Sequence, residues 1–224
     1  MNRFFLILIF LSLVACQSED EHAKTLVTEL GAGSASHRIR AFKALVAMGS
    51  EAIDALIVGL SDENPRVREM STWALSEIKE PAGRVVPALI TVLNDPDENI
   101  RVVGSVTLQR LGEPAVPYLI DALSVDASEI RLNAAYALGE IGAPLDTILP
   151  ALIRTLTDRE WNVRRLAVRA LVTIGTPAVD SLIQALYSED PDLRRMAERA
   201  LNDIGTPKAR QAIADAKRKF SSDQ

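Results

Sequence analysis

Cysteine and histidine are scarce in this 224-residue chain, and aromatic residues make up only 4% of it. A single cysteine, Cys16, excludes a disulfide framework within the chain. The two histidines, His22 and His37, do not stand at a helical metal-ligand spacing. Carboxylates are abundant, but they fall in loops and exposed positions, which gives no support for a paired-acid site. We therefore expect no catalytic residue, no metal, no cofactor and no evident small-molecule substrate.

The charge balance argues against a nucleic-acid partner. The chain carries 25 Lys and Arg against 30 Asp and Glu, which gives a formal net charge of −5. Proteins that hold nucleic acid need a basic groove to neutralise phosphates, and no such excess of positive charge exists here. The shortage of aromatic residues is expected of helices that pack through Ala and Leu.

What the sequence does contain is one helix pattern in six copies, R-x-x-A-x-x-A-L-x-x-I-G. The copies begin at Arg38, Arg68, Arg101, Arg131, Arg164 and Arg194, at intervals of 30, 33, 30, 33 and 30 residues. In the fourth copy the apolar residues share one helical face: Ala134, Ala137, Leu138 and Ile141. Gly142 follows them and suits the left-handed residue just after a helix. Self-similarity at this period predicts stacked helical units rather than a single-core enzyme fold.

A second apolar helix with a shared pattern follows each of the first five copies. Its Leu-Ile pairs begin at Leu56, Leu89, Leu119, Leu152 and Leu182, and another Leu stands four residues after each of these. The copies differ in length within the turn between the two helices, where an insertion leaves the stacking undisturbed. In the segments 175–177 and 205–207, both Gly-Thr-Pro, Gly is expected to end one helix, and Thr and Pro to begin the next.

The combined pattern, D-x-x-x-[VI]-R followed by A-x-x-A-L-x-x-I-G, resembles HEAT repeats, specifically the short bacterial type called PBS-lyase HEAT-like. The resemblance covers about residues 23–220 and implies an all-α, right-handed α-solenoid of HEAT-like helix pairs, which is a superhelix. Residues 23–31 are interpreted as an N-terminal half repeat ahead of the six copies, and residues 221–224 as a tail. The resemblance also implies that the repeated Arg and the loop Asp form a ladder between adjacent repeats rather than a reactive site.

Residues 1–15 are predicted to be a lipoprotein signal peptide rather than part of the fold. A short region with Arg3 precedes an apolar run over residues 4–14, which is too short to span a bilayer. The run leads into Leu-Val-Ala-Cys at residues 13–16, which resembles a lipobox. Cys16 is therefore expected to be alkylated by diacylglycerol.

The predicted lipid on Cys16 leads us to expect that the protein is attached to a membrane. Residues 16–22 would form a lipidated tether, and several acyl chains together anchor a protein stably. We expect a lipid-anchored protein of the bacterial cell envelope. Because Gln17 rather than Asp follows the cysteine, we expect the outer membrane, facing the periplasm, if the cell is Gram-negative.

The outward face of the first helices offers a candidate partner surface. At 100° per residue, positions one and five after each repeat Arg point away from the stack. The candidate protein-binding residues are Trp73, Val102, Val106, Leu132, Tyr136, Arg165 and Arg169, and Arg195 and Arg199 continue the basic part. An exposed apolar strip beside a charged one marks an interface, whereas the alternative is that the aromatic rings pack against the next repeat. Trp161, in the loop before Arg164, is expected to pack under that loop, and the alternative is that it offers an aromatic anchor to a partner.

Two other surfaces are less informative. The second helices carry mostly small outward residues, with Tyr118, Asp121 and Arg154 as exceptions, and the resemblance implies a concave face that often holds an extended peptide. Near the C-terminus, Arg210 and residues 217–219 form a basic cluster. We interpret this cluster first as a solvated cap of the array, and second as a contact for a membrane or a partner.

These observations predict a lipid-anchored, non-catalytic scaffold that binds another protein at a bacterial envelope membrane. The alternative is an enzyme or enzyme-accessory protein of the HEAT-like lyase/hydroxylase group, and a third possibility is a purely structural envelope component. Bilin lyases act on cytoplasmic pigment proteins, which is the wrong compartment for an exported chain, and no residue marks a bilin site. The repeated His-Glu pairs of the di-iron hydroxylases are missing.

Overall fold

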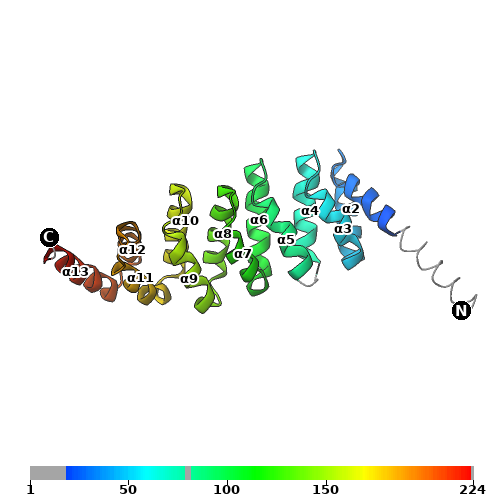
Figure 1. Cartoon of the computed structure of the whole chain (residues 1–224). Coiled ribbons are helices and arrows are strands. Elements are labelled where there is room, and N and C mark those ends of the chain that lie inside the picture. Colours follow the sequence, from blue (N-terminus) through cyan, green and yellow to red (C-terminus); the bar gives the residue numbers. More distant parts are fainter. Residues whose placement is uncertain (1–18, 79–81, 223–224) are drawn as a thin grey trace, which may run out of the picture. The chain divides into compact units, whose positions relative to one another are not determined.

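The computed structural model describes residues 19–78 and 82–222 as a succession of helices (Figure 1). The first helices of the pairs are α2 (Ala35–Met48), α4 (Pro65–Glu77), α6 (Glu98–Leu111), α8 (Ser128–Ile141), α10 (Trp161–Ile174) and α12 (Pro191–Ile204). The second helices are α3 (Ile53–Gly59), α5 (Ala82–Val92), α7 (Val116–Ala122), α9 (Leu145–Thr155), α11 (Val179–Leu186) and α13 (Pro207–Ser222). Residues 19–29 are also helical. The described residues contain no strand, so the all-α class is confirmed.

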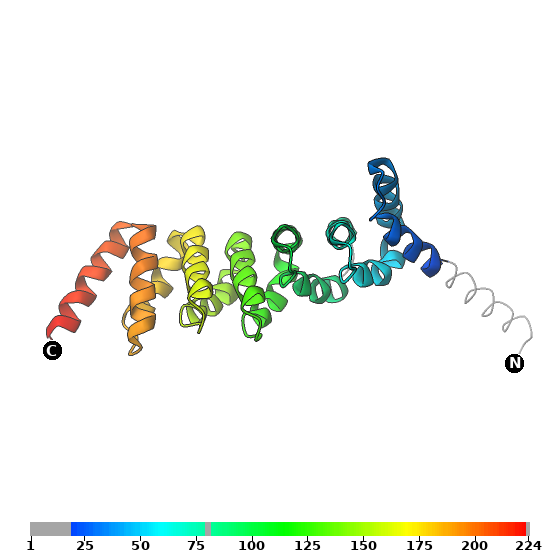
Figure 2. The ribbon, with the colours of Figure 1, turned by 90° about the horizontal axis from the view of Figure 1, so that it is seen from above.

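The helices form two compact units that divide within α6: the first ends at Thr107 and the second begins at Leu108. In the N-terminal unit α2 packs against α4, and α3 packs against α5. In the C-terminal unit α10 packs against both α8 and α12, while α11 packs against α9 and α13 (Figure 2). First helices therefore stack on first helices, and second helices on second helices, as the solenoid prediction requires.

The repeat pattern supplies the core. The Leu of every Leu-Ile pair is fully buried: Leu56, Leu89, Leu119, Leu152 and Leu182. In the fourth copy Ala134, Ala137 and Leu138 are fully buried as well. Beside them, a Cβ on Gly139 would stand 2.6 Å from the Cα of Ala170. Small residues thus let α8 and α10 approach each other closely, and burial is distributed between neighbouring repeats.

In the described residues, the turns between the paired helices are of two kinds. In the first, third and fifth copies the first helix ends at Gly49, Gly112 and Gly175, which have φ of 62°, 69° and 75° and ψ of −126°, −141° and −134°. A 3-10 turn then leads into the second helix, over Gly49–Ala52, Glu113–Ala115 and Thr176–Ala178. In the fourth and sixth copies Gly142 and Gly205 are left-handed instead, and no 3-10 turn follows.

The predicted helix ends are confirmed in part. The N–H of Gly142 donates to the carbonyl of Leu138 at 3.0 Å, as expected of a residue that ends a helix. Thr206 caps α13, because its Oγ1 accepts a hydrogen bond from the N–H of Ala209 at 3.1 Å. Thr176 does not have the same role, since it lies in a 3-10 turn ahead of α11.

Among residues 19–78 and 82–222, no single helix is both long and apolar enough to cross a membrane. The segments Trp161–Ile174 and Thr176–Leu186 meet the length and composition criteria only together, and they are bent by 114°. The predicted signal peptide and Cys16 lie outside the described residues.

Candidate functional site

The repeated Arg is a structural residue. In the fourth copy, Nη1 of Arg131 donates to the carbonyls of Val125 and Asp126 at 2.9 and 2.7 Å. The same two bonds, to the carbonyls six and five residues earlier, are made by Arg38, Arg68, Arg101, Arg164 and Arg194. Each guanidinium therefore holds the loop that precedes its own helix, which is an architectural task common to all copies.

Arg68 and Arg131 also reach into the next repeat. Nε of Arg68 lies 2.7 Å from Oδ2 of Asp95, and Nε of Arg131 lies 2.7 Å from Oδ2 of Asp158. The ladder implied by the resemblance is therefore present at these two junctions. Burial alone would raise the pKa of Asp158, but the hydrogen bonds from Arg131 and from the N–H of Glu160 hold that pKa below its ordinary value.

The predicted binding strip is divided between the two units. Trp73, Val102 and Val106 belong to the N-terminal unit, whereas Leu132, Tyr136, Arg165 and Arg169 belong to the C-terminal unit. In the N-terminal half, Val102 is 55% exposed, and Trp73 and Val106 are half-buried. The first three residues and the last four are therefore two candidate surfaces, one on each unit.

In the C-terminal half, Tyr136 of α8 and Arg169 of α10 are in contact. The guanidinium carbon of Arg169 lies 5.8 Å from the centroid of the Tyr136 ring, within the range of a cation–π interaction. The ring is half-buried and Arg169 is exposed. The Tyr136 ring thus packs against the next repeat, as one of the two alternatives has it, while Arg169 faces solvent. That this surface binds a protein stays a prediction.

Trp161 is the residue that the sequence interpretation misplaced. It is the first residue of α10 and is 46% exposed, rather than packed under the loop. The guanidinium carbons of Arg164 and Arg199 lie 5.6 and 5.5 Å from the centroid of its ring. The sequence does contain a signal for this exposure. Trp161 stands four residues before Arg165, which is at an outward position, and residues four apart on a helix share a face.

Two adjoining recesses lie between the second helices α7 and α9. The first has a volume of about 420 Å³ and is lined by Glu113, Val116, Pro117, Ile120, Asp121, Pro144 and Thr147. The second, of about 230 Å³, shares Ile120 with the first and is lined also by Leu123, Ser124, Ala151, Arg154, Thr155, Thr157 and Asp158. Their combined size is in the range of small-molecule sites.

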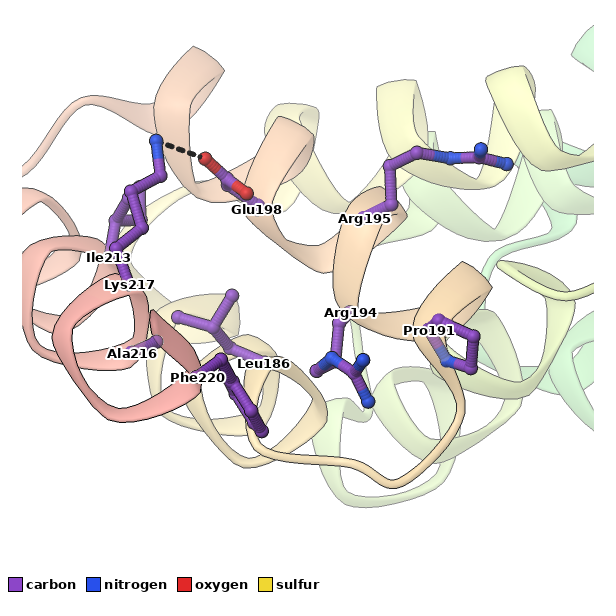
Figure 3. Close-up of a pocket in the computed structure, with 9 residues that line it drawn as sticks. All are labelled: Leu186, Pro191, Arg194, Arg195, Glu198, Ile213, Ala216, Lys217 and Phe220. Atoms are coloured by element: carbon purple, nitrogen blue, oxygen red, sulfur yellow. Dashed lines mark ion pairs between the residues drawn. The ribbon is translucent and has the colours of Figure 1, made fainter. Parts of the chain in front are cut away.

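A further pocket of about 320 Å³ lies at the C-terminal end of the array, between α12 and α13 (Figure 3). Its lining combines apolar Leu186, Pro191, Ile213, Ala216 and Phe220 with charged Arg194, Arg195, Glu198 and Lys217. The guanidinium of Arg194 lies 4.6 Å from the Phe220 ring centroid, and Nζ of Lys217 lies 2.7 Å from Oε1 of Glu198. Ala216 stands where the earlier second helices carry Leu, so the smaller side chain leaves the space.

The part of the chain that the structure describes contains no group of three or more His, Cys, Asp or Glu side chains arranged to hold a metal ion. The sequence prediction of no metal site rests on the residue types and remains a prediction.

The sequence matches the HEAT-repeat family over residues 23–101, 86–152 and 149–221. The chain belongs to the HEAT-repeat family. The match covers the region in which the six copies were recognised, and the predicted class of α-solenoid is confirmed.

Curated relatives include a bilin biosynthesis protein and a lyase subunit. The chain is 33% identical over 136 residues to the bilin biosynthesis protein RpcF of Synechococcus sp. strain WH8020, covering 56% of this chain and 64% of that protein. It is 31% identical over 133 residues to the phycocyanobilin lyase subunit beta of Nostoc sp. strain PCC 7120, covering 54% and 64%. The alignments thus span less than two thirds of these relatives. Among solved structures, the complex of CpcE and CpcF of phycocyanin lyase from Nostoc sp. PCC7120 matches with 28% identity and a TM-score of 0.42, over 87% of this chain and 81% of that chain.

These relatives overturn the prediction of a non-catalytic scaffold at an envelope membrane, and the classification as a non-enzyme is wrong with it. The grounds against a lyase are the predicted export of the chain and the lack of a residue that marks a bilin site. The RpcF and lyase-subunit relatives instead share their sequence with the repeat array itself. The alternative, an enzyme or enzyme-accessory protein of the lyase group, is therefore favoured. An inventory of reactive residues missed it because the function of an array lies in a few surface positions on a common scaffold.

Proposed function

We propose that this chain is a HEAT-repeat subunit of a lyase-type enzyme that acts, together with another protein, on a bilin-type tetrapyrrole. The observation that carries the proposal is the 33% identity of the array to a bilin biosynthesis protein. The second relative is named as one subunit of its lyase, which supports a partner protein for this chain too.

The recesses between α7 and α9 are the proposed tetrapyrrole site. A bilin is an open chain of four pyrrole-type rings, joined by one-carbon bridges, with two propionate groups. Val116, Pro117 and Ile120 provide an apolar wall for such a ligand, because apolar surface is favourably removed from water on contact. Arg154 is exposed in the adjoining recess, where its guanidinium would pair with a propionate.

The contribution of this subunit would be to bind and orient the ligand. Holding reactants in a productive geometry accounts for a large part of many rate enhancements. Glu113 and Asp121 are exposed carboxylates in the lining of the larger recess, so both are placed to accept a proton from the bound tetrapyrrole.

The predicted lipid on Cys16 enters the proposal as a statement about location. The signal-peptide pattern over residues 1–15 supports export, and the anchor would hold the subunit at a bacterial envelope membrane, which is the outer membrane facing the periplasm in a Gram-negative cell.

Titration of the purified chain with biliverdin, followed by visible absorbance, tests the ligand site. We expect saturable binding with a shift of the pigment band, weakened at least about tenfold by Ile120→Glu, which places a charge in the apolar recess. The matched control is Ile57→Glu, at the same repeat position in the N-terminal unit and equally half-buried, which should bind as the wild type does. Absence of saturable binding, or equal loss in both variants, would show that the recess is not the site.

A further inference from the structure

The first helices of the C-terminal unit carry a surface that the tetrapyrrole proposal does not use. We define the cationic strip as Tyr136 of α8, Trp161, Arg165 and Arg169 of α10, and Arg195 and Arg199 of α12. All four arginines are exposed, and α10 packs directly against both α8 and α12. The strip therefore lies on three adjacent helices of one compact unit.

Most of this positive charge has no ion-pair partner in the described part of the chain. Arg195 pairs with Asp192 at 2.7 Å in an exposed contact. Within residues 19–78 and 82–222, no carboxylate forms an ion pair with Arg165, Arg169 or Arg199. An ionic partner from outside the chain would thus meet three cations with which no described carboxylate competes.

The aromatic rings fix two of these cations in place. Arg169 stacks over Tyr136, and Arg199 stacks over Trp161, with distances of 5.8 and 5.5 Å to the ring centroids. Arg binds a ring through its face, which leaves the N–H groups at its edge directed outward for a carboxylate. A side chain that is already held loses less conformational entropy on binding, so these guanidiniums are prepared for a partner.

We propose that the cationic strip docks an acidic helix of the partner protein. The chain as a whole has a net charge of −5, so an acidic partner is repelled over most of the surface and attracted at the strip. Arg165 and Arg169 are four residues apart, as are Arg195 and Arg199, and each pair therefore presents two cations one helical turn apart. A partner helix with carboxylates at i and i+4 has the matching spacing. The inference relies on the proposed function only for the existence of a protein partner.

The experiment uses Trp161 as the reporter. The chain has two tryptophans, so Trp73→Phe leaves Trp161 as the only one. The probe is a 20-residue alanine-rich peptide with Glu at i and i+4 along one face, and the comparison peptide has the same composition with its Glu residues distributed around the helix. We expect saturable quenching by the first peptide, at least about tenfold tighter than by the second, and weakening by salt as surface ion pairs are screened.

Charge reversal identifies the surface. The double variant with Arg169→Glu and Arg199→Glu should weaken binding of the first peptide at least about tenfold. The double variant with Arg169→Gln and Arg199→Gln, which removes the charges without reversing them, should weaken binding less. The control Arg40→Glu/Arg66→Glu makes the same change in net charge at exposed positions of the N-terminal unit, and should bind within about threefold of the wild type. Circular dichroism verifies the folding of each variant.

Several outcomes would overturn the inference. They are equal binding of the two peptides, equal weakening by both charge reversals, or saturable, Arg169- and Arg199-dependent binding of single-stranded DNA or phosphatidylglycerol vesicles that matches the first peptide. Concentration-dependent self-association lost in the same variants would assign the strip to a second copy instead. Biliverdin titration of the Trp73→Phe protein, in which the strip is intact, separates the two proposals. A saturable pigment response without binding of either peptide removes only the docking surface, and peptide binding without a pigment response removes only the tetrapyrrole site.

Discussion

Arg131 and Asp158 form a two-point ion pair across a repeat junction, with Nε to Oδ2 at 2.7 Å and Nη2 to Oδ1 at 3.0 Å. Only 4% of the Arg131 side chain and 10% of the Asp158 side chain are exposed. The same guanidinium binds two loop carbonyls of its own repeat. One side chain thus connects the loop before α8 to the loop before α10, and its loss would leave a buried partner uncompensated.

Asp158→Asn should lower the free energy of unfolding by about 3 kcal/mol at neutral pH, because the variant leaves the buried Arg131 without its counter-charge. The control is Asp126→Asn, whose fully exposed carboxylate contacts Arg159 at 3.4 Å, and which should cost less than about 1 kcal/mol. Urea denaturation measures both. Equal effects would mean that the buried pair contributes nothing specific.

The lowered pKa of Asp158 predicts a pH dependence. A depressed folded-state pKa gives stability that is fully present above the unfolded value, about 3.9 for Asp, and is lost as pH falls through the folded-state pKa. Thermal midpoints of the wild type should therefore fall more steeply below about pH 4 than those of Asp158→Asn. Parallel curves for the two proteins would contradict the assignment.

Gly139→Ala should destabilise the C-terminal unit by about 1–3 kcal/mol, because the new methyl group overlaps the backbone of α10 at Ala170. The matched substitution is Gly33→Ala, where a Cβ meets no atom within 4 Å, and its effect should stay within about 1 kcal/mol of zero. Thermal unfolding followed at 222 nm compares them. A neutral Gly139→Ala would show that α8 and α10 separate at little cost.

Ala216→Leu should stabilise the protein by about 1 kcal/mol, because it restores the Leu of the earlier second helices and fills part of the pocket beside Phe220. Ala214→Leu, on the exposed face of the same helix, is the control and should be close to neutral. Denaturant midpoints distinguish the two variants, and a destabilised Ala216→Leu would mean that the pocket cannot accept the larger side chain.

Cys16→Ser should abolish acylation and release the protein from the membrane fraction, because the thiol is the expected site of the lipid. Membrane partition in high salt and mass spectrometry of the wild type and the variant check this. An unmodified wild-type cysteine, or unchanged partition of the variant, would remove the anchor from the proposal.

The stacking was predictable from the sequence, and several details of the site were not. Leu56 and its equivalents are buried because a fixed repeat position always meets the same neighbours. The contact of Arg199 with Trp161 depends instead on how α12 lies against α10, which no local pattern encodes. The same tripeptide also forms two different turns. Gly175 has ψ of −134° and Gly205 has ψ of 19°, although each is the first residue of a Gly-Thr-Pro segment.

That difference between Gly175 and Gly205 reflects a longer unit of construction. Gly112 and Gly175 adopt one geometry 63 positions apart, Gly142 and Gly205 adopt the other at the same spacing, and the ion pairs of Arg68 and Arg131 are also 63 positions apart. The array is thus a series of four-helix blocks. Adding or removing one block preserves every kind of junction, whereas a change of a single helix pair brings two like repeats together. Chains of this design should therefore vary in length by quartets of helices.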